Sequence, residues 1–256
     1  MRRKRSLLVV GFLFACLSTS GTTAAGGGQN PRSRPRDLSF AEKLNLTVQE
    51  FDTGGSSMTE VALHLAYKYK LPMAIEYADH NALHKPLFLK LKNHSLAQVI
   101  LAVVATLSHY DVDLSQGLVD IYSPDARRDK SNPLNTEIRR YDASSLDTRF
   151  AGAELFCDLI RQLRPHSGCG GSVAGGQWGN LKINLHLENK PVYEVLNAII
   201  AQNGQALWIP VAQPAQDSSI TRDFWYIYPL DPPFERSAIE QLQMLVPSQG
   251  RDPDHE

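Results

Sequence analysis

The sequence has no excess of charge of either sign. It contains 26 lysine and arginine residues against 27 aspartate and glutamate residues, and its formal net charge is −1. The only dense basic cluster runs from Arg2 to Arg5 at the N-terminus, so the chain gives no sign of a nucleic-acid partner. Of its 256 residues, 43% are hydrophobic, which is enough for a real core. The chain is therefore not disordered as a whole.

A run long enough to cross a membrane is missing after that basic cluster. The apolar stretch "SLLVVGFLFAC" has only about ten residues, which is short for a bilayer span. Together with the small residues that follow, it has the layout of a secretory signal peptide over residues 1–25. Alternatively, "LFAC" resembles a bacterial lipoprotein signal, and Cys16 would then be a lipidated N-terminus. We expect an exported protein, periplasmic or associated with the outer membrane, and contact with the membrane only if Cys16 is lipidated.

Cysteine is scarce, with three residues in the chain. If Cys16 leaves with the signal or carries lipid, Cys157 and Cys169 remain as a pair in an oxidising compartment. A disulfide between them would close a loop of about a dozen residues and add about 3 kcal/mol of stability by chain entropy. The competing interpretation, a two-cysteine metal site, lacks the paired short spacing that zinc ligands usually show.

An internal repeat organises the middle of the chain. The segment "LFLKLKNHSLAQVILAVVATLSHY" from Leu87 aligns without a gap on "INLHLENKPVYEVLNAIIAQNG" from Ile183. In both copies three alternating apolar residues predict a strand, and the apolar spacing of three and four that follows predicts a helix packed on a sheet. Asn93 and Asn189 fall at the same position, where each strand is expected to end.

Flanking segments of the same kind complete both copies, and the order strand, helix, strand, strand, helix, strand, strand occurs twice. This predicts an α+β fold made of two tandem small βαββαββ-type domains, each with two helices packed on short sheets. The expected boundaries are 26–43 for a flexible leader, 44–124 for the first domain, 125–136 for a polar linker, 137–230 for the second domain and 231–256 for a polar tail with a short helix. In the second copy a Gly-rich segment occupies the place of one strand.

The stretch from Val48 to Pro124 resembles the short N-terminal domain shared by secretins and TonB-dependent transducers. The segment "LKINLHLENKPVYEVLNAIIAQNGQALWIPV" resembles the second half of that domain. The resemblance implies a periplasmic recognition module without an active site or a cofactor, which meets inner-membrane partners in secretins and passes a signal to an anti-sigma regulator in transducers. No barrel, ring segment or plug is recognised after Leu230. We therefore expect a freestanding pair of domains that bind an envelope protein; the alternative is an accessory component of a secretin-type system that self-associates.

Patterns that suggest catalysis are weak. His80 and His84 are four residues apart and can share a helical face as metal ligands, which leaves a secreted metalloenzyme as a further alternative. A polar loop that happens to contain two histidines is the favoured interpretation, because Pro86 shortens any helix there. The Gly-rich segment lacks the Lys-Ser or Lys-Thr ending of a phosphate-binding loop. We expect no enzyme.

The segment "FWYIY" is the densest aromatic patch. In a strand, alternation sends Phe224 and Tyr226 to one face and Trp225 to the other, so only one set can face a single core. The other set needs a cover, either a partner or another part of this chain. We expect a partner interface at Phe224, Trp225 and Tyr226, together with His186 and Glu188 on the exposed face of the neighbouring repeat strand.

Carboxylates also alternate along the two short strands of the first repeat's hairpin. Asp111, Asp113 and Asp120 occupy these positions. Charged side chains of this kind commonly solvate a sheet face or protect its edge. We therefore expect all three to face solvent.

Overall fold

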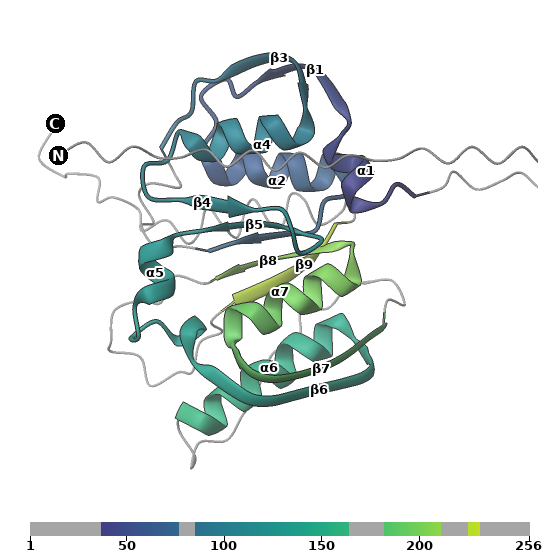
Figure 1. Ribbon diagram of the computed structural model, residues 1–256, viewed down its shortest axis with the longest axis vertical. Helices are drawn as coiled ribbons and strands as arrows, with labels where there is room; N and C mark the ends of the chain where they lie inside the picture. The colour runs from purple at the N-terminus through teal and green to yellow at the C-terminus, as the bar shows by residue number, and fades with distance from the viewer. Residues whose placement is uncertain (1–36, 77–84, 164–181, 211–224, 231–256) are drawn as a thin grey trace, which may run out of the picture. The chain divides into compact units, whose positions relative to one another are not determined.

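The computed structural model describes residues 37–76, 85–163, 182–210 and 225–230 (Figure 1). All of the helices and strands described below belong to one compact unit that begins at Leu38. The first helix, α1 (Phe40–Leu44), begins with a capping box between Ser39 and Glu42. Because Phe40 and Leu44 also pack against a core, the prediction of a flexible leader over 26–43 is wrong for its last residues.

The first repeat contains the predicted elements in the predicted order. They are β1 (Thr47–Asp52), α2 (Met58–Tyr69), β2 (Met73–Ile75), β3 (Lys90–Ser95), α4 (Leu96–Ala105), β4 (Asp111–Asp113) and β5 (Val119–Tyr122). Both long helices begin with a capping box, formed by Ser57 with Glu60 in α2 and by Ser95 with Gln98 in α4. Each box satisfies backbone N–H groups that have no partner inside the helix.

In the second repeat the described residues contain six of the seven predicted elements, and the place of the remaining strand lies outside them. Its elements are β6 (Glu137–Asp147), α6 (Thr148–Leu163), β7 (Lys182–Pro191), α7 (Val192–Asn203), β8 (Ala206–Pro210) and β9 (Trp225–Pro229). The repeated asparagines adopt the same unusual backbone conformation, with φ of 56° at Asn93 and 52° at Asn189. Asparagine tolerates this left-handed region better than most residues. The sequence repeat is therefore also a repeat of backbone geometry.

Residues 125–136, predicted as a polar linker, are structured. They contain most of α5 (Pro124–Arg128) and a 3-10 helix, η1 (Pro133–Asn135). Leu134 is buried in the core of the second repeat, and the side chain of Arg127 is only 19% exposed. The segment joins the repeats as predicted, but as a packed element rather than a free link.

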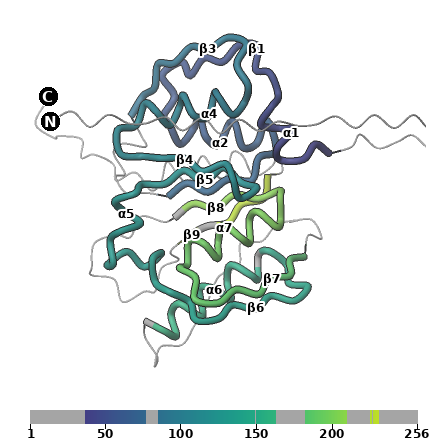
Figure 2. Tube along the Cα trace, in the orientation of Figure 1, coloured from purple at the N-terminus to yellow at the C-terminus, as the bar shows by residue number. Residues whose placement is uncertain are grey.

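The strands form three sheets that lie in layers with the helices. The antiparallel ribbon β1–β3 covers α2 and α4, these helices cover one face of the sheet β4-β5-β2-β8-β9, and α6 and α7 lie between its other face and the antiparallel ribbon β6–β7 (Figure 1). In the trace, the purple-to-teal helices α2 and α4 lie on one side of that sheet and the green helix α7 on the other (Figure 2).

The two repeats share the five-stranded sheet. Strands β2 and β5 of the first repeat are parallel neighbours, and β2 also pairs in parallel with β8 of the second. The predicted mixture of helices and small sheets is therefore present. The two tandem domains that were expected are not separate, because one continuous sheet contains strands of both repeats. Pairing β2 with β8 satisfies the backbone groups that each strand would otherwise leave at a sheet edge.

Alternation along β8 shows how this sheet serves two cores. Leu207 and Ile209 belong to the core formed with α2 and α4, whereas Ala206 and Trp208 belong to the core formed with α6 and α7. All four side chains are buried. A strand buried on both faces explains why β8 is apolar at consecutive positions.

Packing between α6 and β9 is close enough to require glycine at position 152. A Cβ atom placed there would lie 2.6 Å from Ile227 Cδ1. We expect Gly152→Ala to lower the free energy of unfolding by about 1–2 kcal/mol, because overpacking outweighs the gain in helix propensity. Adding Ile227→Val, which removes that methyl group, should recover part of the loss in urea unfolding. An alanine variant as stable as the wild type would contradict this packing.

Candidate functional site

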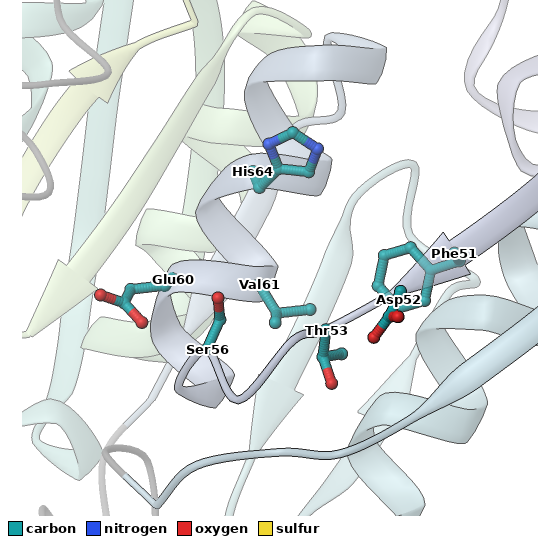
Figure 3. Close-up of a pocket in the computed structure, with 7 residues that line it drawn as sticks. All are labelled: Phe51, Asp52, Thr53, Ser56, Glu60, Val61 and His64. Atoms are coloured by element: carbon teal, nitrogen blue, oxygen red, sulfur yellow. The ribbon is translucent and has the colours of Figure 1, made fainter.

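Two features of the described residues have an arrangement that suggests a role. One is a surface pocket between β1 and α2, and the other is a buried cluster of charged groups between the two repeats. The pocket has a volume of about 290 Å³. Its lining comes from the end of β1, the following turn and the first turns of α2, namely Phe51, Asp52, Thr53, Ser56, Glu60, Val61 and His64 (Figure 3).

Hydrogen bonds hold the turn beside the pocket. The Thr53 hydroxyl donates to the backbone oxygen of Leu87 at 2.6 Å and accepts from the backbone N–H of Leu89 at 2.9 Å. Asp52 accepts from the backbone N–H of Gly54 at 2.9 Å and forms an ion pair with Lys90 at 2.9 Å. The Lys90 ammonium, and then the Gly54 N–H, lower the pKa of Asp52. The carboxylate therefore stays ionised and fixed in place.

Phe88 stands next to this pocket and is the most exposed large apolar side chain in the described part of the chain. It is 83% exposed, whereas its neighbour Leu87 is 6% exposed. The edge of its ring rests on Gly55, where a Cβ atom would lie 3.1 Å from Phe88 Cε1. Gly55 has a φ of 89°, which disfavours other residues. The backbone thus presents the Phe88 ring to solvent on a supported segment.

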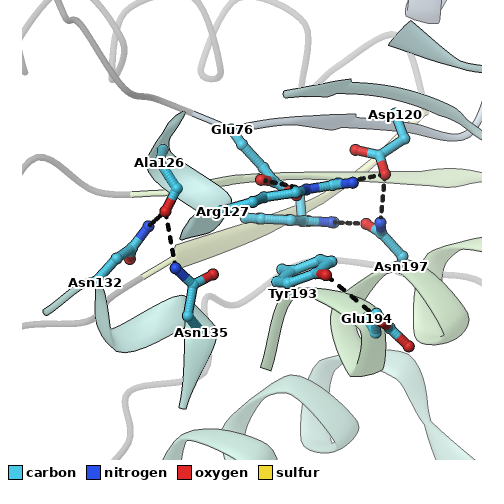
Figure 4. A network of polar contacts seen from close by, with 10 residues as sticks. Glu76, Asp120, Ala126, Arg127, Asn132, Asn135, Tyr193, Glu194 and Asn197 are labelled. Carbon is cyan, nitrogen blue, oxygen red and sulfur yellow. Dashed lines mark hydrogen bonds and ion pairs between the residues drawn. The ribbon is translucent and has the colours of Figure 1, made fainter. Parts of the chain in front are cut away.

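The buried cluster has Arg127 of α5 at its centre (Figure 4). Its guanidinium donates to both carboxylate oxygens of Glu76, from Nε at 3.1 Å and from Nη2 at 2.7 Å. The same Nη2 donates to Asp120 Oδ2 at 2.6 Å. The Tyr122 and Tyr193 rings have their centroids 3.6 and 4.4 Å from the guanidinium carbon, which adds cation–π attraction.

The second repeat is hydrogen-bonded to this cluster. Asn197 of α7 donates from Nδ2 to Asp120 Oδ2 at 2.8 Å. Its Oδ1 accepts from the indole Nε1 of Trp208 at 2.8 Å, and both residues are at most 1% exposed. The chain of polar contacts from Glu76 to Trp208 therefore joins β2, β5 and α5 to α7 and β8.

Burial changes the acidity of the cluster. Desolvation raises the pKa of Glu76 to about 7, even though the hydrogen bond from Arg127 acts in the opposite direction. Desolvation also raises the pKa of Asp120. In each case the charged form is disfavoured because it has lost its water. With both carboxyls ionised, the three groups carry a net charge of −1 in a place where an uncompensated charge costs several kcal/mol.

The expectation that Asp120 faces solvent is wrong. Val119 and Ile121 point into the core of the first repeat, and Asp120 lies on the opposite face of the sheet, where the second repeat covers it with α7. Asp120 is 2% exposed. Sequence reasoning also missed Glu76, Arg127 and Asn197. A charged residue between two β-branched residues was the available signal, but it cannot show what covers the other face.

Of the predicted partner interface, His186 and Glu188 lie on the outer face of the ribbon β6–β7. The ring of His186 is 61% exposed, with Nδ1 2.5 Å from Asp142 and Nε2 3.5 Å from Glu188. Trp225 is different, because it is 6% exposed and packs edge-to-face on Phe156 within the core of the second repeat. Of the two expected covers for Trp225, a partner or another part of this chain, the second is therefore correct. Trp225 is buried and cannot present its ring to a partner.

Several predicted residues lie outside the described residues or are described only in part. Cys16, His80, His84, Cys169 and Phe224 lie outside them, as does the side chain of Tyr226. Cys157 is disulfide-bonded, and its pairing with Cys169 stays a prediction. In the described ranges, no group of three or more His, Cys, Asp and Glu residues is placed to hold a metal ion.

Similarity to known proteins does not identify a role for these features. No family model matches the chain, and no curated protein and no solved structure is significantly similar to it. No helix among the described residues has the length and apolar character needed to cross a membrane.

Proposed function

We propose that this chain is an exported, non-enzymatic recognition protein of the cell envelope. We further propose that it binds another envelope protein through Phe88 and the adjoining pocket. The resemblance to the periplasmic domains of secretins and TonB-dependent transducers supports the first part. The observation that carries the second is the 83% exposure of Phe88. Aromatic side chains supply much of the binding energy at protein interfaces, so an exposed phenylalanine on a supported backbone suits the role of an anchor.

The surroundings of Phe88 suit a binding surface. Leu87 is buried, and the hydroxyl of Thr53 holds the backbone on both sides of the ring. Little conformational entropy is therefore lost when a partner covers Phe88. The pocket beside it is lined in part by Asp52 and Glu60, whose carboxylates already accept hydrogen bonds within the chain and add negative charge to this surface. An apolar anchor next to charged groups is typical of protein recognition rather than of catalysis.

The test begins by identifying the partner. A photo-crosslinking amino acid placed at position 88 is expected to join the full chain to one envelope protein, which mass spectrometry identifies. Phe88→Ala should then weaken binding to that purified protein at least tenfold, because truncation of an anchor costs more than about 1.4 kcal/mol. The variant should unfold at the same urea concentration as the wild type, since its side chain is mostly in water.

The matched control is Leu101→Ala, which removes a 48% exposed apolar side chain from α4. It should leave the affinity unchanged. Equal affinity of wild type and Phe88→Ala would defeat the proposed surface. Crosslinks that join two copies of this chain would instead favour the self-associating accessory component.

A further inference from the structure

Two carboxyl groups and one guanidinium are buried together where the repeats meet. The side chains of Glu76 and Asp120 are 5% and 3% exposed, and that of Arg127 is 19% exposed. One positive charge cannot neutralise two carboxylates. A proton bound to either carboxyl would make the three groups neutral overall, which is favoured because both carboxyls have lost almost all contact with water.

The hydrogen bonds leave one place without a donor. Both oxygens of Glu76 and the Oδ2 atom of Asp120 accept from Arg127. In contrast, Asp120 Oδ1 is buried and has no hydrogen-bond partner among the described residues. A carboxylate with an unsatisfied oxygen is less favourable than a neutral carboxyl at the same position. The geometry therefore favours a carboxyl pair that keeps one proton.

We propose that Glu76 and Asp120 share one proton, and that loss of this proton weakens the junction between the two repeats. Without the proton, two carboxylates compete for one guanidinium, and the excess negative charge draws water toward the cluster. The contact most affected by this change is the hydrogen bond from Asn197 to Asp120, because it links α7 directly to one of the two carboxyls. Trp208 then loses the fixed orientation of its acceptor, Asn197.

Other ionisable groups face this pair from the surrounding elements. Among the described residues, Arg127 of α5 supplies the positive charge that acts on this pair, and Asp113 of β4 adds a negative charge near Asp120. Tyr193 lies across the cluster on α7, next to Glu194, and Tyr122 of β5 lies near Asp111. The charge of Asp113 opposes a second buried carboxylate at Asp120 and favours the bound proton.

The direction of the pH effect follows from the acidity of Glu76. Its pKa is raised from the ordinary 4.5 to about 7 in the folded chain. Between these two values the folded state holds a proton that the unfolded state has released. The cluster's contribution to stability is therefore complete below about pH 4.5 and is lost as the pH rises through 7. A shift of this size makes the folding equilibrium constant roughly a hundredfold less favourable at pH 8 than at pH 4.5.

The variant Glu76→Gln tests this directly, because glutamine has the shape of the protonated acid and cannot ionise. Urea unfolding and the NMR signal of the Trp208 indole N–H are to be followed from pH 5 to 8.5. In the wild type, stability should fall between about pH 4.5 and 7 and level off above, whereas the indole signal of the folded protein should shift with a midpoint near pH 7. In Glu76→Gln both changes should disappear, because the side chain no longer titrates. The test is this loss of pH dependence and not the absolute stability, since one amide position then places an NH2 group against an N–H of Arg127.

Asp125→Asn is the control. Asp125 lies on α5, the helix that carries Arg127, and its side chain is 74% exposed. It should keep the wild-type pH dependence. Identical pH dependence of the wild type and Glu76→Gln would overturn the proposal. If Glu76→Gln does not fold, Asp120→Asn takes its place with the same expectation. Carboxyl ¹³C signals of the wild type give a variant-free readout: titration of both Glu76 and Asp120 below pH 5 would also overturn it.

Discussion

Arg127→Met is expected to destabilise the folded chain by about 3–5 kcal/mol at pH 7. Methionine has a similar length but leaves the carboxyls of Glu76 and Asp120 buried without a positive partner. Arg127→Lys should recover only part of the loss. An ammonium group cannot repeat the two-atom contact with Glu76 or the stacking between two tyrosine rings.

Urea unfolding at constant pH measures this effect. Combining Arg127→Met with Glu76→Gln and Asp120→Asn should restore much of the stability, because the variant cluster then carries no charge. Asp125→Asn serves again as the exposed control and should change stability by less than about 0.5 kcal/mol. If Arg127→Met unfolds at the wild-type urea concentration, the cluster does not stabilise the junction.

Trp208→Ala is the second substitution with a large expected effect, a loss of about 3–5 kcal/mol. Trp208 is fully buried on the central strand β8, where it packs in the core of the second repeat. Truncation removes this packing and leaves a cavity in the shared sheet. It also leaves Asn197 Oδ1 without its donor. Trp208→Phe keeps most of the volume and should cost less, mainly the lost hydrogen bond.

The control for Trp208→Ala is Phe88→Ala, which removes another aromatic ring at a site where it is mostly exposed. The two variants differ in burial more than in chemistry, so their difference in unfolding free energy measures what burial contributes. Thermal unfolding followed by circular dichroism is sufficient. A Trp208→Ala protein as stable as Phe88→Ala would show that β8 does not lie between two cores.

The shared sheet has a consequence for how the repeats respond to change. Because β2 pairs with β8, neither repeat completes its sheet alone, and the cluster around Arg127 lies beside this pairing. Substitutions in the cluster should therefore lower the stability of both repeats together, in one unfolding transition. This cooperativity differs from the expectation for two independent domains, which would unfold separately.

Local structure was predictable because its causes are local. Apolar spacing of two and of three to four identified the strands and helices of both repeats, and Ser95 begins α4 as a helix cap. The prediction that the strands end at Asn93 and Asn189 is wrong, because β3 continues to Ser95 and β7 to Pro191; the two asparagines instead adopt the same left-handed backbone within their strands. Exposure of His186 was also predicted correctly from alternation with the apolar neighbours Leu185 and Leu187, which are partly buried.

Alternation misled at Asp120, which was expected to face solvent because the sequence supports only one core for each repeat. In the structure the second face of β5 is covered by α7 of the other repeat, so Asp120 is buried. For Trp225 alternation left open whether a partner or this chain covers its face, and the structure buries it in the core of its own repeat. Periodicity identifies two faces of a strand, but it does not show how many of them are covered.

By itself the sequence determined the order of strands and helices, the internal repeat and the mixed α and β character of this protein. Only the tertiary structure decided that β2 lies beside β8 and that Glu76, Arg127, Asp120 and Asn197 meet at one point. Arg127 and Glu76 are 51 residues apart, and Asn197 and Asp120 are 77 apart. Such contacts depend on which faces pack together across the whole chain, and short-range periodicity contains no information about that choice.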